Sequence, residues 1–320
     1  MKKLLTTTAM IGALTFATLT DAEAAMKKRV TFENSGQTLV GDLYLPDNYQ
    51  EGQKLPGVIV TGSWTSVKEQ MAGGYAEKLA DKGYAALAFD FRGWGESNVG
   101  TPTSLKFVEH PGEKTKDILA ATDFMAGLPQ VDGTKLATLG VCASAGYAID
   151  AAHMSDKITT AASVAPWLHD KEVVDEVYGE NVPTLLQATA DAKASGKPVI
   201  LEAAGEKGSG AVMEGAVYYI DPNHGAIPEY DDKFSTLSWE PWLNYDAIQT
   251  ARVIQDPVLL VHSEAAAIPQ GAKKFAAEGG DNVELVMMDG VTQFEFYDVP
   301  EAMDAAVKKV DAHFQSSFKK

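Results

Sequence analysis

The sequence predicts an α/β protein in which a mostly parallel central sheet is flanked by helices. Short, uninterrupted apolar runs recur along the chain, and such runs are typical of strands that are buried on both faces. Segments with apolar residues at helical spacing separate these runs, as expected for parallel strands joined by right-handed crossovers. Near the middle of the chain, one apolar run passes directly into a predicted helix through small residues at 139–146.

The amino terminus has the pattern of a secretory signal. Lys2 and Lys3 precede a short apolar run over 4–18, and a small-x-small site follows at Ala22-Glu23-Ala24. We therefore expect residues 1–24 to be a signal peptide and the mature protein to be periplasmic or secreted. No later segment reaches about 18 uninterrupted apolar residues, so we expect the mature chain to be soluble and to make no membrane contact.

The first part of the α/β core is expected over residues 25–165. Residues 29–45 alternate between apolar and polar around Asn34-Ser35-Gly36, which predicts a β-hairpin. The run PGVIVT at 56–61 predicts a buried strand, and 71–82 has helical spacing that ends at Gly83. The same patterns predict further strands at 84–91, 136–141 and 159–165, and helices at 113–128 and 145–154.

Residues 166–243 interrupt this alternation with mixed, aromatic-rich sequence, and the core resumes over 244–320. An insertion between sheet strands usually covers the carboxyl ends of the strands, where open α/β sheets bind ligands. We therefore expect the insertion to form a cap. The resumed core is expected to hold strands at 257–262 and 283–288 and helices at 272–278 and 303–314.

The sequence Leu139-Gly140-Val141-Cys142-Ala143-Ser144-Ala145-Gly146 has the properties of a nucleophile elbow. In such a turn the positions two before and two after the nucleophile must be small, and the nucleophile lies at a helix amino terminus that favours an anion. Two registers are open, with Cys142 or with Ser144 as the nucleophile. The strand expected at 136–141 ends directly before Cys142, which favours the thiol. A small-residue packing turn without covalent chemistry is the third interpretation.

With this elbow, the sequence resembles the α/β-hydrolase superfamily, in particular its dienelactone-hydrolase-like and Xaa-Pro-peptidase-like branches. Residues 90–97 (DFRGWGES) resemble the loop after the family's fourth strand, and 61–64 (TGSW) stand at its oxyanion loop. The resemblance implies the α/β-hydrolase fold and an enzyme that cleaves an ester, lactone or related acyl bond. It also implies that backbone N–H groups of Ala143 or Ala145, and of Ser63 or Trp64, hold the oxyanion.

Two positions of the family's catalytic triad depart from its pattern. Ala266 stands where the resemblance places the acid, which leaves Glu264 as the only carboxylate in that loop, and Gln293 stands where it places the histidine. An amide cannot shuttle a proton, so the alternative is a non-catalytic protein that binds a small molecule or a partner. Peptidase activity is a third option, and it requires the Ser144 register.

Among the six histidines, His169 is our candidate for the general base. It follows the strand expected at 159–165, which should neighbour the elbow strand, and Asp170 or Glu264 could orient it. A thiol needs less assistance than a hydroxyl, because a helix amino terminus lowers its pKa. We expect structural roles for the other histidines, which are His110, His153, His224, His262 and His313.

The composition limits the possible partners. The chain has 320 residues, of which 45% are hydrophobic and 22% charged, and its net charge is −17. These are globular values, and such an acidic protein repels phosphate backbones, so we expect a small-molecule substrate and no nucleic acid. Cys142 is the only cysteine, and no metal, phosphate or dinucleotide motif is present, so we expect no cofactor or metal. The sequence leaves open whether the protein forms a homodimer.

Overall fold

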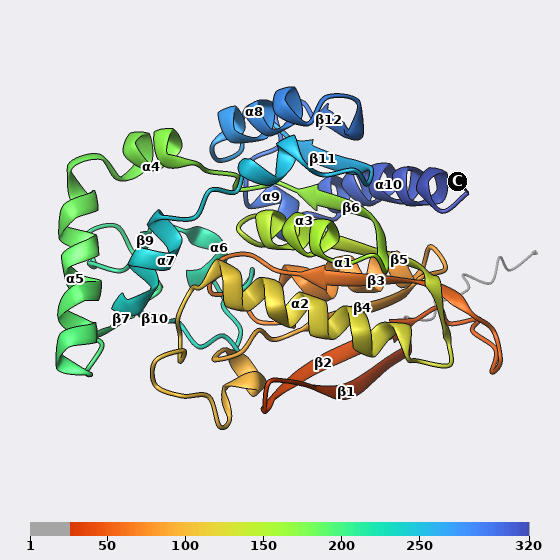
Figure 1. Cartoon of the computed structure of the whole chain (residues 1–320), viewed down its shortest axis with the longest axis horizontal. Helices are drawn as coiled ribbons and strands as arrows, with labels where there is room; N and C mark the ends of the chain where they lie inside the picture. The colour runs from red at the N-terminus through yellow and green to blue at the C-terminus, as the bar shows by residue number, and fades with distance from the viewer. Residues whose placement is uncertain (1–25, 320) are drawn as a thin grey trace, which may run out of the picture.

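The computed structural model describes residues 26–319, so the signal peptide expected at 1–24 lies outside the described residues. The centre of the molecule is an eight-stranded sheet with the order β1-β2-β4-β3-β5-β6-β11-β12 (Figure 1). Its strands are β1 (Met26–Asn34), β2 (Gln37–Leu45), β3 (Leu55–Thr61), β4 (Ala85–Phe89), β5 (Val131–Val141), β6 (Ile158–Val164), β11 (Val258–His262) and β12 (Val283–Met287).

The first two strands form the expected hairpin, and the six strands from β4 to β12 form a parallel sheet beside it. β1 and β2 pair antiparallel from Asn34↔Gln37 onward, and the two turn residues, Ser35 and Gly36, both have positive φ angles. That geometry matches the right-handed twist of the strands. β2 pairs antiparallel with β4, and all pairs from β4 to β12 are parallel. The predicted α/β fold with a mostly parallel sheet is confirmed.

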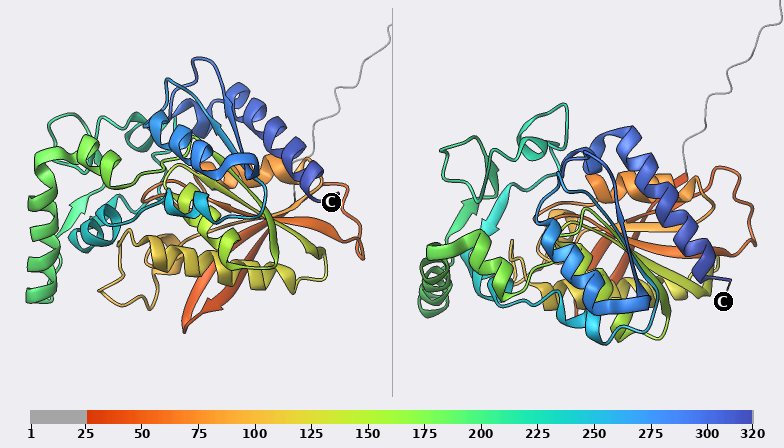
Figure 2. Two further views of the ribbon diagram at one scale, coloured as in Figure 1. Left: turned by 45° about the horizontal axis from the view of Figure 1, so that its top comes forward. Right: turned by 90° about the horizontal axis from the view of Figure 1, so that it is seen from above.

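Helices cover both faces of the sheet. The helices are α1 (Met71–Ala80), α2 (Pro111–Ala126), α3 (Ser144–Met154), α8 (Pro269–Gly279), α9 (Glu295–Asp298) and α10 (Pro300–Ser317). α1 packs with α10 on one face, while α2 and α3 pack together on the other, as both views of Figure 2 show. Within the described residues 26–319, no helix has the length and apolar character that would let it cross a membrane.

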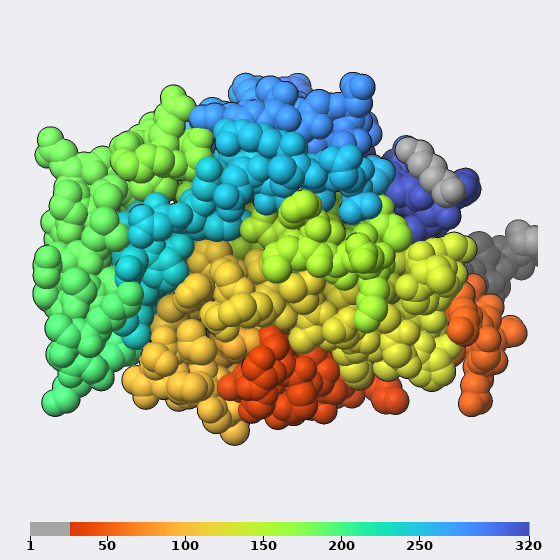
Figure 3. Space-filling view, in the orientation of Figure 1, coloured from red at the N-terminus to blue at the C-terminus, as the bar shows by residue number. Residues whose placement is uncertain are grey.

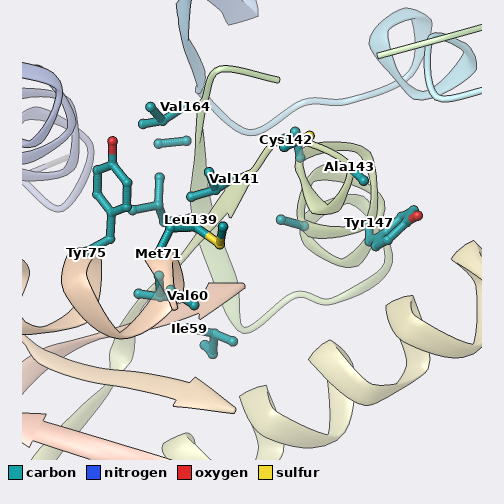
Figure 4. Close-up of a cluster of buried hydrophobic side chains, with 14 of the residues drawn as sticks. Ile59, Val60, Met71, Tyr75, Leu139, Val141, Cys142, Ala143, Tyr147 and Val164 are labelled. Atoms are coloured by element: carbon teal, nitrogen blue, oxygen red, sulfur yellow. The ribbon is translucent and has the colours of Figure 1, made fainter. Parts of the chain in front are cut away.

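The core lies where β3, β5 and β6 run between these helices. Ile59, Val60, Leu139 and Val141 are buried in the sheet, and Tyr75 of α1 lies on the face that carries Leu139 and Val141, whereas Ile59 lies on the opposite face (Figure 4). These strands carry apolar side chains on both faces because helices cover both faces. Their apolar runs therefore predicted the sheet.

Residues 166–243, which we call the cap segment, lie between β6 and β11 in the chain. The segment extends beyond one end of the sheet, at the left of Figure 1, and α5 forms the left edge of the surface in Figure 3. Its elements are α4 (Lys171–Tyr178), α5 (Val182–Ser195), β7 (Ile200–Glu202), β8 (Ala204–Gly205), β9 (Met213–Glu214), α6 (Val217–Ile220), β10 (Lys233–Ser235) and α7 (Trp239–Leu243). β10 pairs with β7 and β8 with β9, apart from the main sheet.

Candidate active site

A strained turn connects β5 to α3. Cys142 has a φ angle of 59°, in the left-handed region that residues other than glycine rarely adopt. Three backbone hydrogen bonds hold it there: its N–H donates to the Val164 carbonyl at 3.1 Å, and its carbonyl accepts from the N–H groups of Ala145 at 3.1 Å and Trp167 at 2.9 Å. A Cβ at Gly140 would lie 2.5 Å from the Ser144 carbonyl oxygen, so only glycine fits this turn. Strain of this kind costs roughly 1–3 kcal/mol and concentrates at functional sites.

The turn separates the two candidate nucleophiles. Cys142 lines a cavity, and Figure 4 places it at the end of β5 directly before α3. Ser144 is 1% exposed and lies beneath the turn, where its Oγ accepts from the Thr61 hydroxyl at 2.9 Å. The same Oγ also contacts the backbone of Val141, at 3.2 Å. The serine side chain thus joins β3 to the elbow and does not line the cavity.

The cavity has a volume of about 320 Å³ and an aromatic lining. It lies between the loops that follow the sheet strands and the cap segment, because both contribute lining residues. Its aromatic residues are Trp64, Trp167, Tyr178, Tyr219, Trp239, Trp242, Phe294 and Tyr297. Within residues 26–319, no histidine and no charged side chain lines it. The cavity therefore suits an apolar or ring-bearing group of modest size.

Three hydrogen-bond donors face the sulfur of Cys142. They are the hydroxyl of Tyr297 and the backbone N–H groups of Ala143 and Trp64. Burial raises the pKa of the Cys142 thiol above its usual value, and the three donors only partly offset that effect. The side chain is therefore a neutral thiol at neutral pH. Two backbone N–H groups beside a nucleophile are also the arrangement that stabilises an oxyanion.

The oxyanion loop after β3 directs one of its two candidate N–H groups toward the thiol. The Trp64 N–H faces Sγ. The Ser63 N–H and hydroxyl instead contact the sulfur of Met71 at 3.5 Å, and the hydroxyl also pairs with that of Tyr219. Thr65 has a φ angle of 61°, which lets the loop fold over the elbow. Of the two residues named from the sequence, Trp64 holds the oxyanion-type position.

Gln293 and Tyr297 together occupy the place opposite the thiol. The Nε2 of Gln293 donates to the Ala165 carbonyl and to the Tyr297 hydroxyl, both at 3.0 Å, and its Oε1 accepts from the Ala267 N–H at 3.0 Å. The Tyr297 hydroxyl in turn bonds to Cys142 Sγ. Burial raises the pKa of Tyr297 well above its usual value, so it is a neutral donor toward the sulfur.

Sequence reasoning identified Gln293 and missed Tyr297. The available signal was spacing, because Tyr297 follows Gln293 by four residues in an aromatic stretch. Residues four apart meet on one face of a helical turn. The short α9 provides that turn and brings the two side chains together.

The structure places the proposed base and acid away from the cavity lining. His169 is 1% exposed, its Nε2 donates to the Trp242 carbonyl at 3.0 Å, and burial lowers its pKa to about 4. Glu264 is exposed and pairs with Lys273 at 2.6 Å. Asp170 caps α4 and does not contact the His169 ring within hydrogen-bond distance. The structure therefore does not bring these three side chains together with Cys142.

The other histidines lie in different surroundings. His262 ends β11, its Nε2 bonds to the Ala267 carbonyl at 3.0 Å, and burial lowers its pKa to about 4. His110 caps α2, His153 is exposed on α3, His224 pairs with Asp298 and His313 bonds to Thr160. In the described part of the chain, no group of three or more His, Cys, Asp or Glu side chains could hold a metal ion.

Comparison with known proteins gives three consistent matches. The model of the Dienelactone hydrolase family matches residues 41–210. The uncharacterized protein PA2218 of Pseudomonas aeruginosa is 30% identical, over 85% of this chain and 76% of that protein. Its crystal structure superposes with a TM-score of 0.78 at 24% identity, covering 96% of this chain and all of that one.

Two fungal proteins are also similar, one in sequence and one in fold. A thiohydrolase of Eupenicillium brefeldianum is 24% identical over 72% of this chain and 77% of that protein. The alpha/beta hydrolase GrgF of a Penicillium species has a TM-score of 0.72 at 17% identity, over 91% of this chain and 99% of that one. The fold described above is therefore the one found in the structures of PA2218 and GrgF.

Proposed function

Because the chain belongs to the dienelactone hydrolase family, we propose that it is an exported enzyme that cleaves an ester, lactone or related acyl bond through Cys142. The single observation that carries this proposal is the strained elbow, which holds the thiol in an apolar cavity against two backbone N–H groups. A packing turn would not require a left-handed cysteine, since strain without function is seldom retained.

The first chemical step follows from the groups around the sulfur. Sγ of Cys142 attacks the acyl carbonyl, and the developing oxyanion accepts from the N–H groups of Trp64 and Ala143. The thiol proton passes to solvent, a Cys142–acyl bond forms, and the bond to the leaving group breaks, so that the leaving group departs as an anion. Tyr297 donates to the sulfur and lowers the cost of its negative charge.

The missing base limits the substrates. Since no charged side chain or histidine of residues 26–319 lines the cavity, the leaving group must depart without a protein acid. Thiolates, phenolates and enolates can do so because they are weak bases, whereas alkoxides and amines cannot. We therefore propose thioesters, aryl esters and enol lactones with an apolar acyl group. The name of the thiohydrolase relative is consistent with the first of these classes.

A second candidate function is binding without turnover. It is favoured by Gln293, whose amide fills the position of the family's histidine with three hydrogen bonds. A protein of this kind would be stabilised thermally by a ligand in the aromatic cavity and would release no product from any ester or thioester.

A panel of aryl esters and thioesters tests the two candidates. The assay compares the wild type with Cys142→Ser, Cys142→Ala and Ser144→Ala. We expect product release from the wild type, its loss in Cys142→Ala, and its retention in Ser144→Ala once unfolding curves have established the folded fraction. Undiminished activity in both Cys142 variants would reject the thiol as nucleophile.

Export is tested separately. The full chain, expressed in a bacterial host, should appear in the periplasm or medium with its amino terminus at residue 25 or 26. Retention of residues 1–24 on a cytoplasmic product would overturn this part of the proposal.

A further inference from the structure

The structure also bears on what happens after Cys142 is acylated, and this inference rests on the proposed function. The geometry points to an acyl-Cys142 intermediate that water discharges slowly and that an acceptor thiol discharges rapidly. Gln293 is the residue that sets this outcome, because it occupies the position from which a base would activate water.

The hydrogen bonds of Gln293 fix its amide in one orientation. Ala267 N–H is a donor and can pair only with Oε1, whereas the Ala165 carbonyl is an acceptor and can pair only with Nε2. Nε2 also donates to Tyr297. The amide nitrogen thus donates twice, and neither the nitrogen nor the oxygen of an amide is a base at neutral pH. Gln293 cannot take a proton from water.

The hydroxyl groups of the cavity cannot replace a base either. Burial raises the pKa of Tyr297 and of Tyr219 well above their usual values, and it raises the pKa of Tyr178 to about 12. Each is also engaged: Tyr219 pairs with Ser63, and Tyr178 accepts from the Trp242 indole at 2.7 Å. At neutral pH, the described cavity therefore holds three neutral phenols and no group that accepts a proton from water.

A thiol can act as acceptor without a base supplied by the protein. With a pKa of about 8.5, roughly 3% of a free thiol is thiolate at pH 7, whereas water needs a base to reach a comparable nucleophile. The acceptor releases its proton to solvent, its sulfur forms a bond to the acyl carbon, and the Cys142–acyl bond breaks. Sγ departs as a thiolate that accepts from Tyr297, Ala143 and Trp64, and then regains a proton from solvent.

The acceptor has a route to the sulfur. Val177 lines the cavity and is 41% exposed, so the cavity opens to solvent beside α4. The lining is largely apolar, and Trp167 and Val212 in it are partly exposed. A small neutral thiol can enter through it more easily than a charged one can.

The lifetime of the intermediate tests the inference. The mature protein is acylated with a p-nitrophenyl ester of an apolar acid and freed of excess ester. Intact mass spectrometry then follows the adduct in buffer alone and with 2-mercaptoethanol. We expect slow loss in buffer, close to that of the same acyl group on a small thiol in solution, and loss at least tenfold faster with 2-mercaptoethanol than the same reaction of the small-molecule thioester.

Variants of Gln293 distinguish the effect of adding a base from the effect of losing the hydrogen bonds that Gln293 makes. Gln293→His restores a base, and we expect it to accelerate loss of the adduct in buffer by about 100-fold, the lower end of general-base effects. Gln293→Ala removes the same hydrogen bonds without adding a base and should not accelerate the loss. Circular dichroism verifies that both variants are folded.

Each result has a distinct meaning. Rapid loss of the wild-type adduct in buffer would overturn the inference while leaving Cys142 as the nucleophile. If 2-mercaptoethanol removed the acyl group from Cys142 no faster than it does from the small-molecule thioester, the inferred discharge by an acceptor thiol would be overturned. Absence of any adduct together with no release of p-nitrophenol would overturn the proposed function itself, and the inference with it, whereas absence of an adduct with continued release would indicate rapid discharge and overturn the inference alone.

Discussion

At the scale of single residues, the protonation of Cys142 decides how the site reacts. Burial raises the pKa of its thiol, so the thiolate fraction at neutral pH is small and increases with pH. We predict that the rate of iodoacetamide alkylation of Cys142 rises steadily from pH 7 to beyond pH 9. Tyr297→Phe removes one donor to the sulfur and should slow alkylation at each pH. A rate that levels off below pH 8 would contradict this account, because it would indicate an ion-paired thiolate.

His169 provides a second test at this scale, through stability. An unfolded histidine gains a proton near pH 6.5, whereas burial lowers the pKa of folded His169 to about 4. The unfolded state therefore binds more protons in this window, and the free energy of unfolding falls as the pH drops from 6.5 to 4. With 1.36 kcal/mol per pKa unit, the loss is at most about 3 kcal/mol.

Urea unfolding at pH 7 and pH 4.5 measures this loss. His169→Gln, which keeps a donor for the Trp242 carbonyl, should lose less stability on acidification than the wild type and should retain acylation of Cys142. His153→Gln, at an exposed position on α3, is the matched control and should behave as the wild type does. Abolished acylation in folded His169→Gln would instead make His169 the base.

The sequence could indicate Cys142, Trp64 and Gln293, because motifs with fixed spacing carry these positions. It could not indicate which way the His169 ring turns, since that depends on Trp242, which lies 73 residues further along the chain. Nor could it indicate that Tyr297 reaches the sulfur, because that contact depends on packing between α9 and the elbow.

At the scale of elements, the elbow depends on the absence of a side chain at Gly140. An added Cβ would lie 2.5 Å from the Ser144 carbonyl oxygen and 2.6 Å from the Ala145 Cα, and neither backbone atom can yield easily. We predict that Gly140→Ala lowers the free energy of unfolding by roughly 1–3 kcal/mol and abolishes acylation of Cys142.

The control for Gly140→Ala is Gly127→Ala at the end of α2. Its added Cβ would have ordinary contacts of 3.5 Å or more, and its φ angle is −85°. Thermal and urea unfolding of both variants decide the matter. Equal stability and equal acylation in the two variants would show that the turn has more room than the structure gives it.

The sequence predicted the strands and helices of the main sheet correctly, because their buried residues recur at strand or helix spacing. It missed the individual elements of the cap segment. The sheet strands and their helices were found because their apolar residues face a core on one or two sides. Helix α5 was not found: only Thr189 and Ala192 of its 14 residues are buried, and its apolar residues Val182, Leu185 and Leu186 are only partly buried against the core. The short strands of the cap segment pair with one another outside the main sheet. Each has only two or three residues, which is too few to show an alternation of apolar and polar residues.

At the scale of the whole molecule, specificity depends on how the cap segment and the sheet together enclose the cavity. Ala216 of the cap segment is 7% exposed and lines it. We predict that Ala216→Leu, which fills part of the 320 Å³, lowers kcat/KM for a large aromatic acyl ester by roughly tenfold or more and changes acetyl ester cleavage little.

Val199→Leu is the control for this prediction, because Val199 is 58% exposed in the cap segment and does not line the cavity. Kinetic assays with esters of increasing acyl size compare the three proteins. An equal loss for small and large acyl groups in Ala216→Leu would mean that the acyl group does not occupy this cavity.

The most direct test of the whole account is to locate the acyl group on the chain. The mature protein is treated briefly with an apolar p-nitrophenyl ester, quenched in acid, digested and examined by peptide mass spectrometry. We predict one acyl group per chain, on the peptide containing Cys142 and at that residue. Labelling of Ser144, or p-nitrophenol release by Cys142→Ala at the wild-type rate, would contradict the account.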